Sequence, residues 1–130
     1  MTDGIYLDNN ATTMVAPEVV EAMLPFFTER YGNASSMHSF GGGLIVDIRR
    51  ARRQVAELIG AQPEEILFTS GGTESNNAAI LGSWFAQDRQ DGVIVTSAVE
   101  HPAVLQPLLA LEMDGRISLT VVGVDGRGRV

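Results

Sequence analysis

The chain contains no cysteine, so neither a disulfide framework nor a thiolate metal site can form within it. No run of residues approaches the roughly 18 apolar positions that a membrane-spanning helix needs. The start, "MTDGIYLDNN", lacks the basic segment followed by a long apolar segment that marks a secretory signal. These absences predict a cytoplasmic protein with no membrane partner.

Positive charge is also scarce. Nine basic residues stand against 16 acidic ones, which gives a net charge of -7, and all nine are arginine because the chain has no lysine. Proteins bind phosphate backbones through clustered Lys and Arg, so this balance argues against a nucleic-acid partner. The one basic cluster, residues 49–53, lies in a helical pattern and is most simply a solvated face.

What the chain has in quantity is apolar residues, at 45% of its 130 positions, which is enough for a packed core. Strand patterns alternate with helix patterns. The helices are expected from Pro17 with a bend at Pro25, at 44–59 ended by Gly60, at 74–88 and at 102–114, and the strands at 5–7, 65–69, 92–99 and 117–124, with a loop at 31–43. Such alternation indicates an α/β fold with a mainly parallel sheet. We expect the chain to be the beginning of a larger α/β domain.

The stretch "TSGGTESNNAA", residues 69–79, follows the apolar run 66–68 and leads into a helix. A glycine turn at a helix N-terminus aims free backbone N–H groups and the positive end of the helix dipole at one point, which attracts phosphate. Gly71 and Gly72 let the backbone approach an anion, and the hydroxyls of Ser70 and Thr73 can add donors. The dinucleotide and triphosphate fingerprints are absent. The alternative is a simple turn with Thr73 as the N-cap.

His101, in "VEHPAV", follows a strand and precedes a proline suited to the first helical position. It is therefore expected at the carboxyl edge of the sheet, where open α/β sheets bind ligands, close to the glycine turn. The alternative is a histidine that only caps the helix. His38 has weaker support as a site residue, and residues 8–13 form either a pocket wall or an Asx turn. No metal-ligand set is visible.

Four motifs in order carry a family resemblance: "IYLDNNATT", "MLPFFTERYGNASSMHSFG", "EILFTSGGTESNNAAI" and "VEHPAV". Together they resemble the N-terminal part of a cysteine desulfurase of the NifS/IscS type, a pyridoxal phosphate enzyme of the class V aminotransferases. The resemblance covers nearly the whole chain. It is weaker over residues 41–53, and Ala34 stands where a proline is common.

The resemblance implies that residues 1–130 are the N-terminal part of the large domain of a fold-type I transferase, with a mainly parallel sheet and flanking helices, in a homodimer. It implies that Gly72 and Thr73 hold the phosphate of pyridoxal 5'-phosphate. His101 would stack on the pyridine ring and act catalytically in moving protons, with residues 8–13 and 33–38 nearby. The family converts L-cysteine to L-alanine and leaves an enzyme persulfide that feeds iron–sulfur cluster assembly, for which a scaffold protein is the expected partner.

The missing lysine and cysteine then limit what the chain can do alone. Pyridoxal chemistry uses a lysine Schiff base, and the desulfurase reaction uses a cysteine to accept sulfur. We expect both residues to lie beyond Val130 and the 130 residues alone to be inactive. Two alternatives are a non-catalytic remnant or interaction module, and another class V enzyme such as a selenocysteine lyase.

Overall fold

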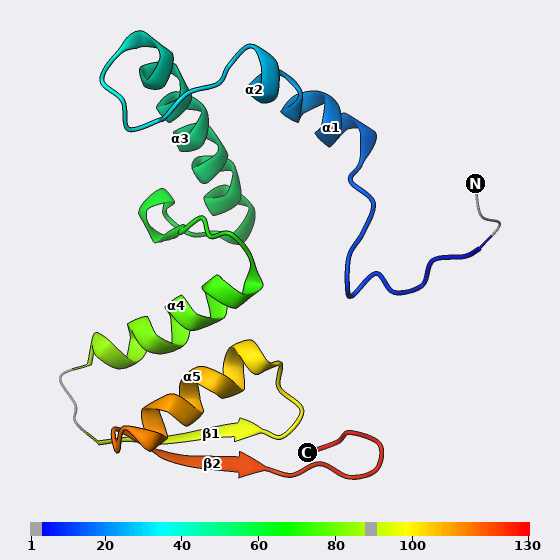
Figure 1. The fold of residues 1–130 in the computed structure, drawn as a ribbon, viewed down its shortest axis with the longest axis vertical. Coiled ribbons are helices and arrows are strands. Elements are labelled where there is room, and N and C mark those ends of the chain that lie inside the picture. Colours follow the sequence, from blue (N-terminus) through cyan, green and yellow to red (C-terminus); the bar gives the residue numbers. More distant parts are fainter. Residues whose placement is uncertain (1–3, 88–90) are drawn as a thin grey trace. The chain divides into compact units, whose positions relative to one another are not determined.

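A computed structural model describes residues 4–87 and 91–130, and the chain divides into two compact units, Met1–Ile66 and Leu67–Val130. The first unit holds the helices α1 (Pro17–Met23), α2 (Pro25–Thr28) and α3 (Ser39–Ile59) and the 3-10 turn η1 (Pro63–Glu65). The second unit holds α4 (Gly72–Phe85), β1 (Val93–Ser97), α5 (Pro102–Met113) and β2 (Ser118–Val122) (Figure 1). Each unit is a compact body in which its own residues pack together.

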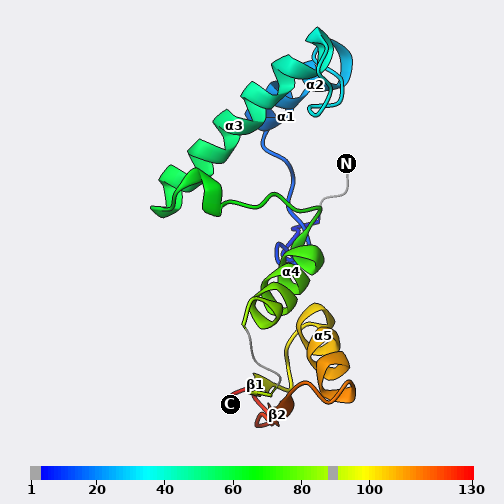
Figure 2. The ribbon, with the colours of Figure 1, turned by 90° about the vertical axis from the view of Figure 1, so that its left-hand side faces the viewer.

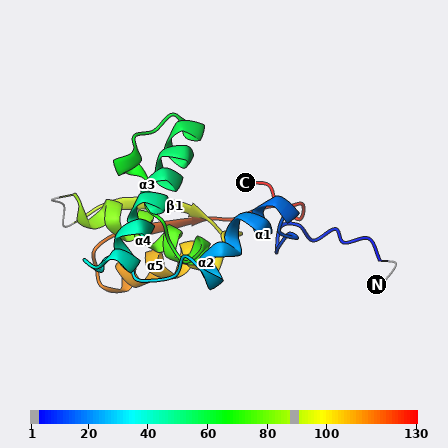
Figure 3. The same cartoon turned by 90° about the horizontal axis from the view of Figure 1, so that it is seen from above.

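Residues 4–16 contain no strand. Residues 4–16 lead as an irregular chain into α1 (Figure 3), and the strand expected at 5–7 is wrong. Ile5 is 85% exposed, and no described strand runs beside it, so its backbone has no partner for a ladder. The prolines behave as predicted, because Pro17 and Pro25 each open a helix and the chain bends at Leu24 between them.

Helix α3 begins at Ser39, five residues before the start predicted at 44 (Figure 2). The glycines at 41–43 resemble a loop in sequence, yet they are helical. Gly41 is buried, and a Cβ there would collide with the carbonyl oxygen of Asn33. The preceding loop therefore packs directly on the first turn of the helix, which only glycine allows. The end is as predicted: Gly60 adopts φ of 70° and closes the helix as a left-handed cap.

The strand predicted at 65–69 is also wrong. Pro63 opens the 3-10 turn η1, and the Glu65 side chain accepts the Gln62 backbone N–H at 2.7 Å, which draws Glu65 into the turn. Residues 66–69 that follow pair with no strand among the described residues. The apolar run predicted extended backbone correctly at Ile66, where φ is -92° and ψ is 121°, but an extended segment becomes a strand only beside a partner.

The second unit contains the parallel pair that the sequence predicts. β1 and β2 run in parallel from Val93 opposite Ser118 to Ser97 opposite Val122, and α5 connects them. Figure 1 shows the strands side by side, with α5 along them and α4 next to α5. Both strands are shorter than the predicted 92–99 and 117–124. The helices at 74–88 and 102–114 are confirmed as α4 and α5, although residue 88 lies outside the described residues.

The core of this unit is small and apolar. Its buried members come from α4, α5 and the residue just before β2, and they are Trp84, Leu108, Leu111 and Ile117. Ile94 and Leu119, which are paired across the two strands, pack against this cluster. One face of the strand pair thus rests on α5, and this packing fixes the first turns of α4 and α5 on one side of the unit.

Candidate functional site

The glycine turn leads into α4 as predicted, with one correction. Gly71 is the N-cap and Gly72 the first helical residue, so the alternative that made Thr73 the N-cap is wrong. The carbonyl of Gly71 accepts the N–H of Ser75 at 3.0 Å, which starts the helical hydrogen bonding. The N–H groups of Gly72 and Thr73 come before that first bond and have no carbonyl to bind inside the helix. With the helix dipole behind them, they favour an anion.

Space around this turn is open. A Cβ added at Gly71 or Gly72 would meet nothing within 4 Å. No side chain therefore blocks the approach of a ligand to the two glycine peptides. The open glycine turn therefore suits an anion that accepts hydrogen bonds directly from backbone N–H groups.

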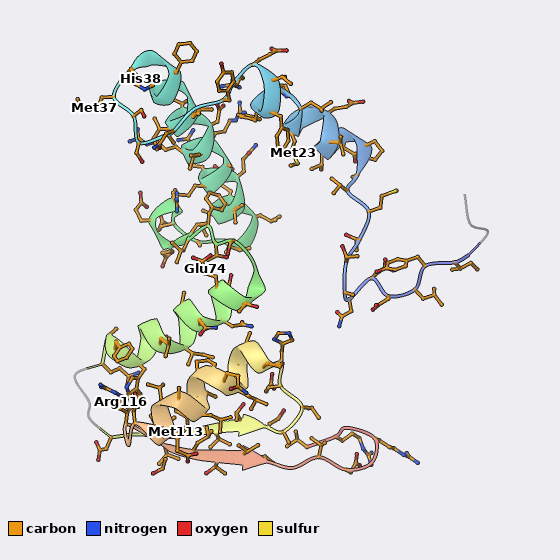
Figure 4. All side chains as sticks on the ribbon, in the orientation of Figure 1. Met23, Met37, His38, Glu74, Met113 and Arg116 are labelled. Carbon is orange, nitrogen blue, oxygen red and sulfur yellow. The ribbon has the colours of Figure 1, made fainter. Side chains whose placement is uncertain are left out.

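Glu74, in the first turn of α4 (Figure 4), binds Ser70, the residue before the two glycines. Its Oε2 accepts the Ser70 backbone N–H at 2.6 Å and the Ser70 hydroxyl at 2.7 Å. The hydroxyl and then the backbone N–H of Ser70 lower the pKa of the Glu74 carboxyl, because both hydrogen bonds favour the charged form. Ser70, which the sequence offered as a further donor, is thus already committed to a carboxylate inside the chain.

His101 is the N-cap of α5. Its Nδ1 accepts the backbone N–H of Ala103 at 3.0 Å, and Pro102 occupies the first helical position as predicted. A nitrogen that accepts carries no proton, so in the neutral ring the proton lies on Nε2. The histidine therefore caps the helix with one nitrogen while its exposed ring leaves the other nitrogen available.

Thr73 and His101 line one groove of about 760 Å³ between α4 and α5. The second unit thus brings together two of the three predicted site residues, and Gly72 adjoins Thr73 in sequence. The rest of the groove is mostly apolar, and its further lining residues are Asn77, Leu81, Phe85, Pro102, Ala103, Gln106, Pro107, Ala110, Leu111 and Asp114. A mostly apolar groove with a few polar groups is typical of a small-molecule site.

Asn77 is the groove residue that the sequence did not single out. Its side-chain nitrogen donates to the Thr73 carbonyl at 2.9 Å and to the Ala103 carbonyl at 3.4 Å. The only sequence signal for it is its position four residues after Thr73, which places both on one face of the helix.

The other candidates lie in the first unit. The N–H groups of Ala11 and Thr12 both donate to the Asp8 carbonyl, so residues 8–12 form a turn. His38 is the residue before α3, and its ring meets that of Phe40 edge-on at 6.4 Å between centroids. Within the described residues, no group of three or more His, Cys, Asp or Glu side chains could hold a metal ion.

The sequence model of one family, aminotransferase class-V, matches residues 5–130. The chain belongs to this family. It is 54% identical, over 97% of its length, to a cysteine desulfurase of Trichormus azollae. It also aligns over 92% of its length with two solved structures: a NifS-like protein at 38% identity with a TM-score of 0.75, and SspA in complex with cysteine at 36% identity with a TM-score of 0.76.

These class-V relatives confirm the resemblance and the fold class read from the sequence. The chain shares the α/β fold of NifS-like proteins, pyridoxal phosphate enzymes of fold-type I, over 32% of the solved NifS-like chain. It likewise spans 31% of the Trichormus azollae desulfurase, about a third of the relative's length. In the part of the chain that the structure describes, no helix combines the length and the apolar character required to cross a bilayer.

Proposed function

We propose that this chain supplies the phosphate-binding and ring-facing part of the pyridoxal 5'-phosphate site of a cysteine desulfurase. The observation that carries the proposal is that Thr73 and His101 line one groove, in a chain whose class-V relatives include proteins named cysteine desulfurase. Residues 1–130 would form the N-terminal part of the large domain.

The residues present fit the phosphate. Gly72 and Thr73 supply backbone N–H groups at a helix N-terminus with open space in front of them, and the exposed Thr73 hydroxyl adds a donor. Since Glu74 already holds Ser70, the free donors of this turn are concentrated at Gly72 and Thr73. That arrangement matches a terminal phosphate that is bound by a few backbone groups.

The residues also fit a planar ring. His101 presents an exposed imidazole at the mouth of the groove, tethered to α5 through Nδ1, and the groove walls beside it include Pro102 and Pro107. When bound, pyridoxal phosphate acts as an electron sink for bond cleavage at the amino acid's α-carbon and beyond. His101 would stack on the ring and act as the catalytic residue that moves protons, and its available nitrogen for that task is Nε2.

The substrate and partners follow from the family and are part of the proposal. The complete protein would convert L-cysteine to L-alanine and pass the sulfur to an enzyme cysteine, which becomes a persulfide. It would work as a homodimer in the cytoplasm and deliver the sulfur to an iron–sulfur scaffold protein. The 130 residues contain neither the lysine that attaches the cofactor nor the cysteine that accepts sulfur. On their own they would bind the cofactor without turning over substrate.

Equilibrium titration of the chain with pyridoxal 5'-phosphate, followed by absorbance, tests the proposal. The N-terminal amine is acetylated first, because it is the amine able to form an imine in a chain without lysine. We expect saturable binding that inorganic phosphate competes away, and weaker binding of pyridoxal, which lacks the phosphate. Equal affinities for the two compounds would contradict the phosphate site. Sulfide release from L-cysteine by the 130-residue chain would contradict its predicted inactivity.

A further inference from the structure

Asn77 lies between the two groups proposed to meet the cofactor. Its Nδ2 donates to the carbonyl of Thr73 at 2.9 Å and to the carbonyl of Ala103 at 3.4 Å. Ala103 is 6% exposed, and its own N–H donates to Nδ1 of His101 at 3.0 Å. Three hydrogen bonds therefore run in series from Thr73 through Asn77 and Ala103 to His101.

We infer that Asn77 is a positioning residue that fixes the His101 ring relative to the Gly72–Thr73 turn. The inference rests on the proposed cofactor site. In that site, the Asn77 side chain would set the distance between the residues that hold the phosphate and the imidazole that faces the ring. Packing of α4 on α5 holds the helices together through Trp84, Leu108 and Leu111. Such apolar contacts are individually non-directional, and the hydrogen bonds of Asn77 add a directional contact between Thr73 and the first turn of α5.

The chemistry of the contact demands an amide. Both partners of Asn77 are carbonyl oxygens, which only accept, so the side chain must present two donors on one atom. The NH₂ group of asparagine meets that need. An aspartate of the same shape would set carboxylate oxygens against two carbonyls. The side chain is half-buried, so water replaces the lost bonds poorly.

The link to His101 passes through the backbone of Ala103. The carbonyl of Ala103 accepts from Asn77, and its N–H holds the imidazole nitrogen. When Asn77 is removed, the first turn of α5 loses its only hydrogen bond to α4 among the described residues. The bond from Ala103 to Nδ1 then loosens with it. Helix packing alone predicts lower stability but no change at the imidazole.

Nitrogen-15 NMR of histidine-labelled chain at about pH 8.5, where imidazole is neutral, tests the inference. The chain has two histidines, and His38, whose ring nitrogens bond no other described residue, is the internal reference. In the unmodified chain we expect Nδ1 of His101 to resonate as an unprotonated acceptor. Asn77→Ala and Asn77→Asp should each lower the fraction of molecules in which Nδ1 of His101 accepts the Ala103 N–H. We expect this fraction to fall roughly two- to tenfold, which is the effect of one net hydrogen bond.

The matched control is Asn76→Asp, which makes the same change one residue earlier on α4. The Asn76 side chain makes no hydrogen bond to another described residue, so His101 should keep its tautomer. An unchanged His101 signal in a folded Asn77→Asp or Asn77→Ala chain would overturn the inference, and so would an equal shift in the control. Circular dichroism checks folding, and the nearly isosteric Asn77→Asp replaces Asn77→Ala if the latter unfolds.

A second readout separates this inference from the proposed function. Pyridoxal 5'-phosphate is titrated into the unmodified chain and both Asn77 variants. Weaker binding by the variants supports the positioning role. Absence of binding by the unmodified chain would overturn the proposed cofactor site, whereas normal binding with an unresponsive His101 signal would overturn only the role of Asn77.

Discussion

Replacing His101 in two different ways separates its capping role from its proposed catalytic role. His101→Ala removes both the imidazole and the acceptor for the Ala103 N–H, which is 3.0 Å from Nδ1. Loss of an N-cap acceptor costs about 0.5–2 kcal/mol of folding free energy. Because Ala103 is only 6% exposed, its freed N–H reaches water poorly. We therefore expect the upper half of that range, about 1–2 kcal/mol.

His101→Asn keeps the cap, since asparagine is among the best N-cap residues, but removes the ring. We expect its free energy of unfolding to stay within a few tenths of a kcal/mol of the unmodified chain. Its affinity for pyridoxal 5'-phosphate should fall to that of His101→Ala. Urea unfolding followed by circular dichroism gives the first quantity, and cofactor titration gives the second.

Two results would refute this reasoning. If His101→Ala is as stable as the unmodified chain, the contact of Nδ1 with the Ala103 N–H does not hold the start of α5. If His101→Asn binds the cofactor as tightly as the unmodified chain, the imidazole does not face the ring. Either outcome is informative because the two variants share every other contact.

Three further predictions concern neighbouring residues. Thr73→Ala should weaken cofactor binding by roughly 0.5–3 kcal/mol in titrations, the range for hydrogen bonds to neutral or charged groups, and unaltered affinity would exclude its hydroxyl from the phosphate site. The hydrogen bonds from Ser70 lower the pKa of the Glu74 carboxyl. The stabilisation of the fold by Glu74 should therefore be complete above the ordinary glutamate pKa of about 4.3, and it should be lost as the pH falls through the lowered pKa of the folded state. In Glu74→Gln, the urea midpoint of unfolding should not show this loss of stability as the pH falls. Leu111→Ala, at a side chain 3% exposed, should cost about 2–5 kcal/mol in urea unfolding, whereas Leu109→Ala, 38% exposed, should cost less.

The elements that the sequence predicts well are those specified by local chemistry. Proline at a first helical turn located α1 and α5, and Gly60 located the end of α3. Alternating βαβ composition predicted the parallel pair of β1 and β2. Each of these signals depends on a few neighbouring residues, so no distant contact is needed to interpret it.

The errors arise where a distant contact decides. The glycines at 41–43 resemble a loop in sequence, and only the approach of Asn33 explains why the helix needs glycine at position 41. The apolar run at 66–68 predicts a strand, but strand formation depends on a neighbour that composition cannot reveal. Asn77 escaped notice for the same reason, because its second partner, Ala103, is 26 residues away along the chain.

The two interpretations of His101 that the sequence left open turn out to be compatible. Capping occupies Nδ1, and this occupation assigns the proton of the neutral ring to Nε2. A ring without the cap would exchange between two tautomers and two orientations. Proton transfer to a bound ligand needs one nitrogen in one place, so the helix cap is what makes this imidazole suitable for the proposed chemistry. The capping bond at the edge of the groove is therefore compatible with the proposed catalytic role of His101.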